Sequence, residues 1–260
     1  MLIAGRLVPG LSLLVTALLV VWSIQRARHG DVPTIRRMVA LEAIEEVVGR
    51  CTEMGRPLVM IPGCGDIVDN TAIETMAGLE ILGYVAKKTA AMDADLRVVV
   101  ARANVYPLAV DRVREAYTAV GKPDQFDAEK QVLFMSGDQN AYIMGAVGLM
   151  QREKAAGAVM CGYFTGDTTL VAEGAALAGA LSVAGLIRVT HVAYFVVQAD
   201  YTLIGEELLV AGALVSQNSV KLGSVRAQDY VKMIGAITIL VGVLMATLGS
   251  AKPLLDFLRL

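Results

Sequence analysis

The sequence predicts an α/β fold in which a mostly parallel sheet is flanked by a membrane-spanning helix at each end of the chain. Three observations support this. Two uncharged apolar stretches lie near the termini, short β-branched runs alternate with longer helical patterns between them, and Gly, Pro, Asp or Asn marks most of the changes. The composition agrees, because the mean hydropathy is +0.57 and aromatic residues make up only 5% of the 260 residues. We therefore expect tightly packed helices and strands.

The first apolar stretch, Leu7 to Ile24, predicts a transmembrane helix. Its roughly eighteen residues rise about 1.5 Å each and nearly cross a hydrocarbon core of roughly 30 Å. A cleaved signal peptide is the alternative, but the stretch is longer than the usual ~7 to 15 residues and no A-x-A site follows it. Residues 1–25 are expected to be a retained anchor and 26–40 a basic linker. The arginines of this linker favour the cytoplasmic side: Arg26, Arg28, Arg36 and Arg37.

The second apolar stretch, Met233 to Ala251, predicts a helix that returns across the bilayer. Lys232 and Lys252 bound it, and it is long enough to span the hydrocarbon core. Residues 219–232 are expected to link it to the main domain, and 252–260 to form a tail. The lipid bilayer is thus an expected partner, with both termini outside and the main domain in the cytoplasm.

Between the anchors, residues 41–218 predict one cytoplasmic α/β domain that begins with a helix over Leu41–Met54, ended by Gly55. Five parallel strands joined by right-handed crossovers would make a Rossmann-like, doubly wound sheet. The expected strands are Leu58–Ile61, Leu96–Ala101, Gln131–Met135, Ala158–Phe164 and Val192–Val197. The helices expected after them are Thr71–Met92, Leu108–Val120, Gln139–Lys154, Thr168–Leu186 and Leu203–Val215.

The helix expected over Thr168–Leu186 has two interpretations. The run from Gly174 to Ile187 is uncharged and apolar on every side, as in a transmembrane span. Its length of about fourteen residues and its place between two strands favour a buried helix instead. Small residues in this segment provide either a surface for self-association or close packing beneath the sheet: Ala175, Ala176, Ala178, Gly179, Ala180 and Gly185.

Charge and metal-ligating residues argue against several functional classes. The net charge is −2, and no basic stripe lies outside the arginines beside the membrane, so nucleic acid is not an expected partner. The three cysteines lack C-x-x-C spacing and are expected to be free, buried thiols. His29 and His191 lie far apart, so no metal site is expected, and a catalytic pair of Cys64 with His191 has little support.

The loops at the expected carboxyl ends of the strands are polar, and ligands of open parallel sheets bind there. Four aspartates at one edge would suit a divalent cation or a polar ligand, although capping the next helix explains each of them separately. Glu173, Glu206 and Glu207 are expected either to bind a ligand or an adjacent subunit, or to lie in first helical turns. The candidate ligand-binding residues are Gly63, Gly65, Asp66, Asp138, Asp167, Asp200 and Glu206.

Gly63-Cys64-Gly65, after the first strand, resembles the start of a dinucleotide-binding fingerprint. The resemblance stops at Val68, where a third small residue is expected. Arg102 follows the second strand, where an acidic group would hold a ribose. A turn that needs positive φ is therefore the preferred explanation of the glycines. No Walker-type phosphate loop is present, so the sequence names no cofactor.

Two segments are specific to a known family: Thr52-Glu53-Met54-Gly55-Arg56-Pro57 and Asp200-Tyr201-Thr202-Leu203-Ile204-Gly205-Glu206-Glu207-Leu208. With shorter matches they resemble a prokaryotic membrane-protein family, domain of unknown function 6754, from about Leu41 to Lys232. The resemblance implies membrane association, but no activity and no catalytic residues. The chain departs from the family pattern at Gly166-Asp167-Thr168, where a glutamate tends to follow the fourth strand.

Two functions remain open. The first is a self-associating, homo-oligomeric membrane scaffold or complex component, which the anchors, the small-residue helix and the missing catalytic set favour. The alternative is an enzyme or sensor that binds a nucleotide or another small polar ligand at the carboxyl ends of the strands. The sequence does not decide whether the protein is an enzyme.

Overall fold

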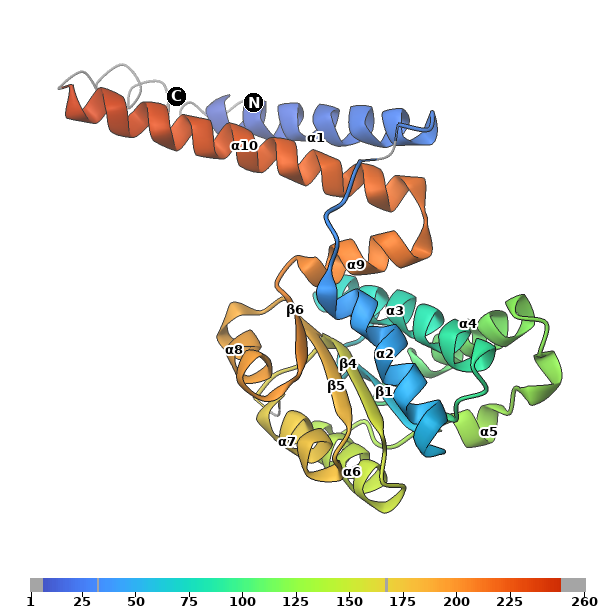
Figure 1. Ribbon diagram of the computed structural model, residues 1–260. Helices are drawn as coiled ribbons and strands as arrows, with labels where there is room; N and C mark the ends of the chain where they lie inside the picture. The colour runs from blue at the N-terminus through green and yellow to red at the C-terminus, as the bar shows by residue number, and fades with distance from the viewer. Residues whose placement is uncertain (1–6, 32, 167, 249–260) are drawn as a thin grey trace. The chain divides into compact units, whose positions relative to one another are not determined.

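A computed structural model describes residues 7–31, 33–166 and 168–248 of the chain (Figure 1). The chain forms two compact units. A helical unit comprises Met1–Ile35 and Gln217–Leu260, and an α/β unit comprises Arg36–Ser216.

The helical unit consists of α1 (Leu7–Arg28) and α10 (Ser219–Thr247), which pack together side by side (Figure 1). Gly223 on α10 lets the two helix backbones approach closely, because a Cβ there would lie 2.8 Å from the Cα of Ile24 on α1. Just beyond the C-terminal end of α1, the carboxylate of Asp31 accepts a hydrogen bond from Arg226 of α10 at 3.0 Å. Residues 219–232, expected as a linker, are the first part of α10.

The sheet of the α/β unit has six strands, all parallel, in the order β3-β2-β1-β4-β5-β6. This confirms the predicted doubly wound fold, with one strand more than expected, and the order is that of the Rossmann fold. The connections from β1 to β2 and β3 cover one face of the sheet, and those among β4, β5 and β6 cover the other. The topological switch point therefore lies between β1 and β4. The strands are β1 (Leu58–Gly63), β2 (Leu96–Val100), β3 (Val132–Phe134), β4 (Gly157–Tyr163), β5 (Leu181–Leu186) and β6 (Tyr201–Ile204).

Helices cover both faces of the sheet (Figure 1). One face carries α2 (Val39–Met54), α3 (Ala72–Ala91), α4 (Tyr106–Ala119) and α9 (Glu207–Ser216). The other carries α6 (Gln139–Arg152), α7 (Thr168–Ala178) and α8 (Val189–Gln198), while η1 (Pro123–Gln125) and α5 (Ala128–Gln131) precede β3. Every residue of β1 and β2 is buried, as expected of parallel strands covered on two sides.

The single helix expected over Thr168–Leu186 is wrong: the segment forms α7 and then β5. Gly179 ends α7 with a φ of +74°, and the N–H of Ala180 donates to the carbonyl oxygen of Ala175 at 3.0 Å, as in a Schellman motif. Because a parallel strand covered on both faces is also apolar throughout, the uncharged run is half helix and half strand. It is therefore not a third membrane span.

The strand expected over Val192–Val197 is also wrong, because these residues lie in α8. Their β-branched composition resembles that of a strand, but Val192 and Phe195 are buried at helical i, i+3 spacing. Phe195 packs edge-on against Phe164 with ring centroids 5.4 Å apart. The last strand is β6, so the helix expected from Leu203 begins only at α9.

Candidate functional site

The carboxyl ends of β1 and β4 pack backbone against backbone at the switch point. A Cβ on Gly63 would lie 2.3 Å from the carbonyl oxygen of Tyr163, and a Cβ on Gly162 would lie 2.0 Å from that of Pro62. The N–H of Cys64 donates to the same Tyr163 oxygen at 2.8 Å. Glycine is therefore required at both positions, at the point where doubly wound sheets bind their ligands.

The glycines near β1 fill only part of the dinucleotide-binding fingerprint. Gly63 makes the turn with a φ of +89°, and Gly78 on α3 gives close helix packing, since its Cβ would lie 2.5 Å from a carbonyl oxygen of β4. A Cβ on Gly65, however, would lie 2.4 Å from the Thr75 hydroxyl and 2.8 Å from that of Thr71. The protein's own side chains occupy the space that a pyrophosphate would approach, so the geometry does not fit a dinucleotide held in that way.

Hydrogen bonds connect the loops that follow β1, β2 and β3. The carboxylate of Asp66 accepts from the side-chain amide of Asn104 at 3.3 Å. Arg102 donates to the carbonyl oxygens of Cys64 at 3.0 Å and Gly137 at 3.2 Å. Asp66 thus lies at the predicted edge, and Arg102 holds two of its loops together.

A charged cluster at the switch point was missed by the sequence analysis. Glu74, in the first turn of α3, is 8% exposed, and its Oε1 lies 3.8 Å from Nε of Arg188. Arg188 directly precedes α8, and its guanidinium stacks over the ring of Tyr163, 4.6 Å from the centroid. Among the described residues, Oε2 of Glu74 is buried and has no hydrogen-bond partner. Burial raises the pKa of this carboxyl, and Arg188 opposes the shift.

The topology explains why Glu74 and Arg188 were missed. Glu74 has the sequence pattern of an ordinary first-turn acid, and Arg188 was expected to lie between a helix and a strand. In the structure Arg188 follows β5, so it lies at the same edge as the end of β1. An arginine directly after the apolar run that forms β5 was the available signal, once that run is recognised as a strand.

Three other predicted residues lie where helices begin or turns occur. Asp138 caps α6 and accepts from the N–H of Ala141 at 2.9 Å, which confirms the capping interpretation. Glu206 is exposed in the turn between β6 and α9. Glu173 is exposed in the second turn of α7, so its expected first-turn position was wrong. Glu207 accepts from the N–H of Ile204 at 3.1 Å and pairs with Arg36, as a first-turn carboxylate. Asp167 lies outside the described residues.

Asp200 lies at the opposite, amino edge of the sheet, so its predicted place was wrong. Its carboxylate accepts from the N–H of Ser182 at 2.8 Å and from the hydroxyl of Ser182 at 2.9 Å. The prediction assumed that Asp200 follows a strand. Because the segment before it is α8, Asp200 directly precedes β6 and connects the starts of β5 and β6.

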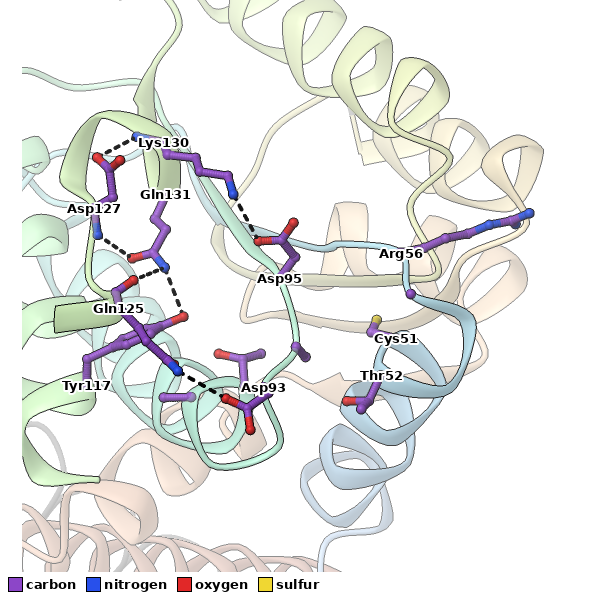
Figure 2. Close-up of a pocket in the computed structure, with 14 residues that line it drawn as sticks. Cys51, Thr52, Arg56, Asp93, Asp95, Tyr117, Gln125, Asp127, Lys130 and Gln131 are labelled. Atoms are coloured by element: carbon purple, nitrogen blue, oxygen red, sulfur yellow. Dashed lines mark hydrogen bonds and ion pairs between the residues drawn. The ribbon is translucent and has the colours of Figure 1, made fainter. Parts of the chain in front are cut away.

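A pocket of about 460 Å³ lies at this amino edge (Figure 2). Its walls are the end of α2, the loop between α3 and β2, and the segment from η1 to α5. Lys130 lies 3.7 Å from Asp95, and Gln125 donates to Asp93 at 3.4 Å. Figure 2 shows the side chain of Arg56 extending away from these groups. The pocket has the volume of a ligand site, but its acidic side chains already have partners within the protein.

Comparison with protein-family models matches residues 2–255 to the model described as Domain of unknown function (DUF6754). The chain belongs to this family. The DUF6754 match extends beyond the resemblance noted from residue 41 to 232 and includes both apolar helices. Neither curated proteins nor solved structures give a match to this DUF6754 chain.

The three cysteines of this DUF6754 member are buried thiols that form no disulfide, as predicted. Burial raises the pKa of the Cys51 thiol, which lies in the wall of the amino-edge pocket, to about 12. The same cause raises the pKa of Cys161 to about 12. Both thiols stay protonated near neutral pH, so neither is a nucleophile. Within the part of the chain that the structure describes, no group of three His, Cys, Asp or Glu residues is placed to hold a metal ion.

Proposed function

We propose that this DUF6754 protein is a membrane-anchored domain that binds a small polar ligand at the carboxyl edge of its sheet, near the ends of β1, β4 and β5. The observation that carries this proposal is the Oε2 atom of Glu74, which is buried without a hydrogen-bond partner among the described residues. Leaving a buried acceptor unsatisfied costs about 1 to 3 kcal/mol. A ligand that supplies the missing donor would offset this cost.

The surroundings of Glu74 support the same location. Arg188 is close to Glu74 and its side chain is 39% exposed, so its guanidinium is accessible to a ligand from solvent. Doubly wound sheets bind ligands at their switch point, and this rule supports the place but not the chemistry.

Anchoring rests on the two long helices. Gly10–Arg28 and Ser219–Thr247 are long and apolar enough to cross a membrane by length and composition. The rings of Trp22 and Tyr230 lie 5.9 Å apart, and Arg26 stacks over Trp22, as expected at a membrane–water interface. Both helices then carry exposed apolar side chains that would face lipid: Leu11, Leu13, Leu14, Leu18, Ile237, Ile239, Leu240, Val243 and Leu244.

The α/β unit would then lie in the cytoplasm, the side that the arginines of residues 26–40 favour. Labelling of introduced cysteines tests this placement of the α/β unit. The natural cysteines are buried, so they give little background. We expect an impermeant maleimide to label an Asp256→Cys variant, in the tail expected over 252–260, in intact cells, and an Asp124→Cys variant only after permeabilisation. Labelling of Asp124→Cys in intact cells would place the α/β unit outside.

Thermal unfolding of the full chain in detergent tests the ligand site. The panel comprises the proteinogenic amino acids, the ribonucleotides and inorganic phosphate. We expect at least one compound to raise the Tm of the wild type but not that of Arg188→Ala. Arg114→Ala is the matched control, because Arg114 is exposed on α4 and pairs with Asp111. A shift that survives Arg188→Ala, or no shift at all, would contradict the proposal.

A second candidate function is self-association, which the exposed apolar side chains of α7 and α8 favour. These two helices pack against each other, and such surfaces often mark protein contacts. Gly174, by contrast, packs inside the domain, since its Cβ would lie 2.6 Å from Val147 on α6. The exposed side chains are Leu170, Leu177, Val189, Tyr194, Val196 and Val197.

Cross-linking in native membranes tests this second candidate. Val197 is 84% exposed, so Val197→Lys should leave the fold intact while placing a charge on the apolar face. We expect cross-linked dimers in the wild type and fewer in the variant. A wild type that yields only monomer would exclude self-association.

A further inference from the structure

We infer that the carboxyl-edge ligand is a small zwitterion of the α-amino acid class, with its ammonium group at Glu74 and its carboxylate at Arg188. The inference rests on the proposed ligand site and adds its chemistry. Glu74, Arg188 and Tyr163 come from α3, the loop after β5, and the end of β4, so the three side chains converge at the switch point.

Glu74 requires a hydrogen-bond donor that the described residues do not supply. Its Oε1 atom is 3.8 Å from Nε of Arg188, which is beyond hydrogen-bond distance, and its Oε2 atom has no hydrogen-bond partner among the described residues. The guanidinium therefore compensates the charge without satisfying either oxygen. An ammonium group carries three donors and fits this need better than a group with acceptors only.

Arg188 is arranged to receive a carboxylate. Its guanidinium lies over the ring of Tyr163, which restricts its orientation, and the side chain is 39% exposed. A planar guanidinium binds a carboxylate through two parallel hydrogen bonds. A zwitterion would thus replace one long ion pair by two direct charge-assisted contacts, and it would leave the net charge of the site unchanged.

The start of α3 is unsuited to a phosphate group. Asp69 already accepts from the N–H of Thr71 at 2.8 Å, and its carbonyl oxygen accepts from the N–H of Ala72 at 3.2 Å. Two of the amide groups that could hold a phosphate at the helix N-terminus therefore have partners. Asp66, Asp69 and Glu74 also place three carboxylates in this loop and first turn, which disfavour a ligand of net negative charge, such as phosphate, more than a neutral zwitterion.

The test is equilibrium binding to the full chain in detergent micelles, measured by calorimetry for each of the twenty proteinogenic amino acids. For the tightest binder we expect at least a tenfold weaker Kd with Glu74→Gln and with Arg188→Ala. Its decarboxylated amine and its deaminated acid should each bind at least tenfold more weakly to the wild type.

Glu80→Gln is the matched control, because the side chain of Glu80, also on α3, is 10% exposed like that of Glu74 but forms an ion pair with Arg112 at 3.0 Å. Its Kd should stay within threefold of the wild type. Circular dichroism shows whether each variant is folded.

Two results would overturn the inference in different ways. If AMP or inorganic phosphate binds and the binding requires Arg188 but not Glu74, the carboxyl-edge site stands and its zwitterion chemistry is wrong. If no amino acid and no phosphate compound binds in a way that requires Arg188, the proposed function fails as well.

Discussion

The two edges of the sheet treat their charged groups differently. At the amino edge, Arg97 is 9% exposed and lies 3.1 Å from Glu153 and 3.3 Å from Asp95, and Lys122 lies 2.6 Å from Asp93. At the carboxyl edge, the buried Glu74 has a single long contact of 3.8 Å with Arg188. The amino edge has the described pocket, but its charges are satisfied by the protein. The unmet hydrogen bond of Glu74, rather than pocket volume, is therefore the basis of the proposed ligand site.

The largest expected effect breaks the backbone packing at the carboxyl edge. Gly63→Ala adds a Cβ 2.3 Å from the Tyr163 oxygen, at a φ of +89°, and should destabilise the fold by about 3 kcal/mol. Gly121→Ala is the control, because Gly121 has a φ of +78° but nothing within 4 Å of its Cβ, and should cost about 1 kcal/mol. Urea unfolding in detergent followed by circular dichroism measures both. Equal destabilisation by the two substitutions would show that the ends of β1 and β4 shift to accommodate the added Cβ.

The next effect concerns the paired charges of the amino edge. Arg97→Ala leaves Glu153 and Asp95 without this cation and removes buried packing, so we expect a loss of about 2 kcal/mol in the free energy of unfolding. Arg114→Ala breaks an exposed pair and should cost less than about 1 kcal/mol. The same urea titration compares them. A loss for Arg97→Ala no greater than that of the control would mean that the amino-edge pairs contribute little.

A smaller effect compares two glutamates of α3 whose side chains are each 10% exposed. Glu80→Gln weakens the ion pair with the partly exposed Arg112, and we expect a loss of about 1 to 2 kcal/mol. Glu74→Gln removes a buried charge with poor compensation, so the free energy of unfolding should stay equal or rise by up to about 1 kcal/mol. Thermal unfolding at neutral pH measures the change in stability, and its sign, for both variants. Destabilisation of both variants to the same extent would show that Glu74 is structurally satisfied.

The smallest effect is a pH dependence of opposite sign in two glutamates. Burial raises the pKa of Glu74, so the folded chain takes up its proton first and gains stability as pH falls toward the ordinary value of 4.5. The hydrogen bond from Lys88 lowers the pKa of Glu45, so its contribution is present above 4.5 and is lost on further acidification. Stability is measured from pH 7 to pH 3, and the wild-type value minus that of Glu74→Gln should rise on acidification, whereas the wild-type value minus that of Glu45→Gln should fall below pH 4.5. Parallel curves would contradict both assignments.

The first four strands were predictable because each short apolar run is bounded by turn residues and followed by a longer helical pattern. The elements after β4 were not predictable in this way, since β5 is as apolar as a buried helix and α8 is as rich in β-branched residues as a strand. Only the φ of +74° at Gly179, which sequence pattern alone does not reveal, separates α7 from β5.

The candidate site was predictable only in part. Asp66 follows a correctly predicted strand, so its edge was right, whereas the error at α8 moved Asp200 to the wrong edge. Glu74 could not be distinguished from any other first-turn acid, because its burial and its unsatisfied oxygen depend on Arg188, Tyr163 and the packing of distant segments.

The pairing of β1 with β4 has a consequence during synthesis. Gly63 is opposite Tyr163 in this register, about a hundred residues later in the chain. At a translation rate of about 5 to 20 residues per second, β1 waits roughly 5 to 20 s for its central neighbour. During that time an entirely apolar strand edge, at the middle of the future sheet, is open to other nascent chains, so this protein should need chaperone protection most between the emergence of β1 and that of β4.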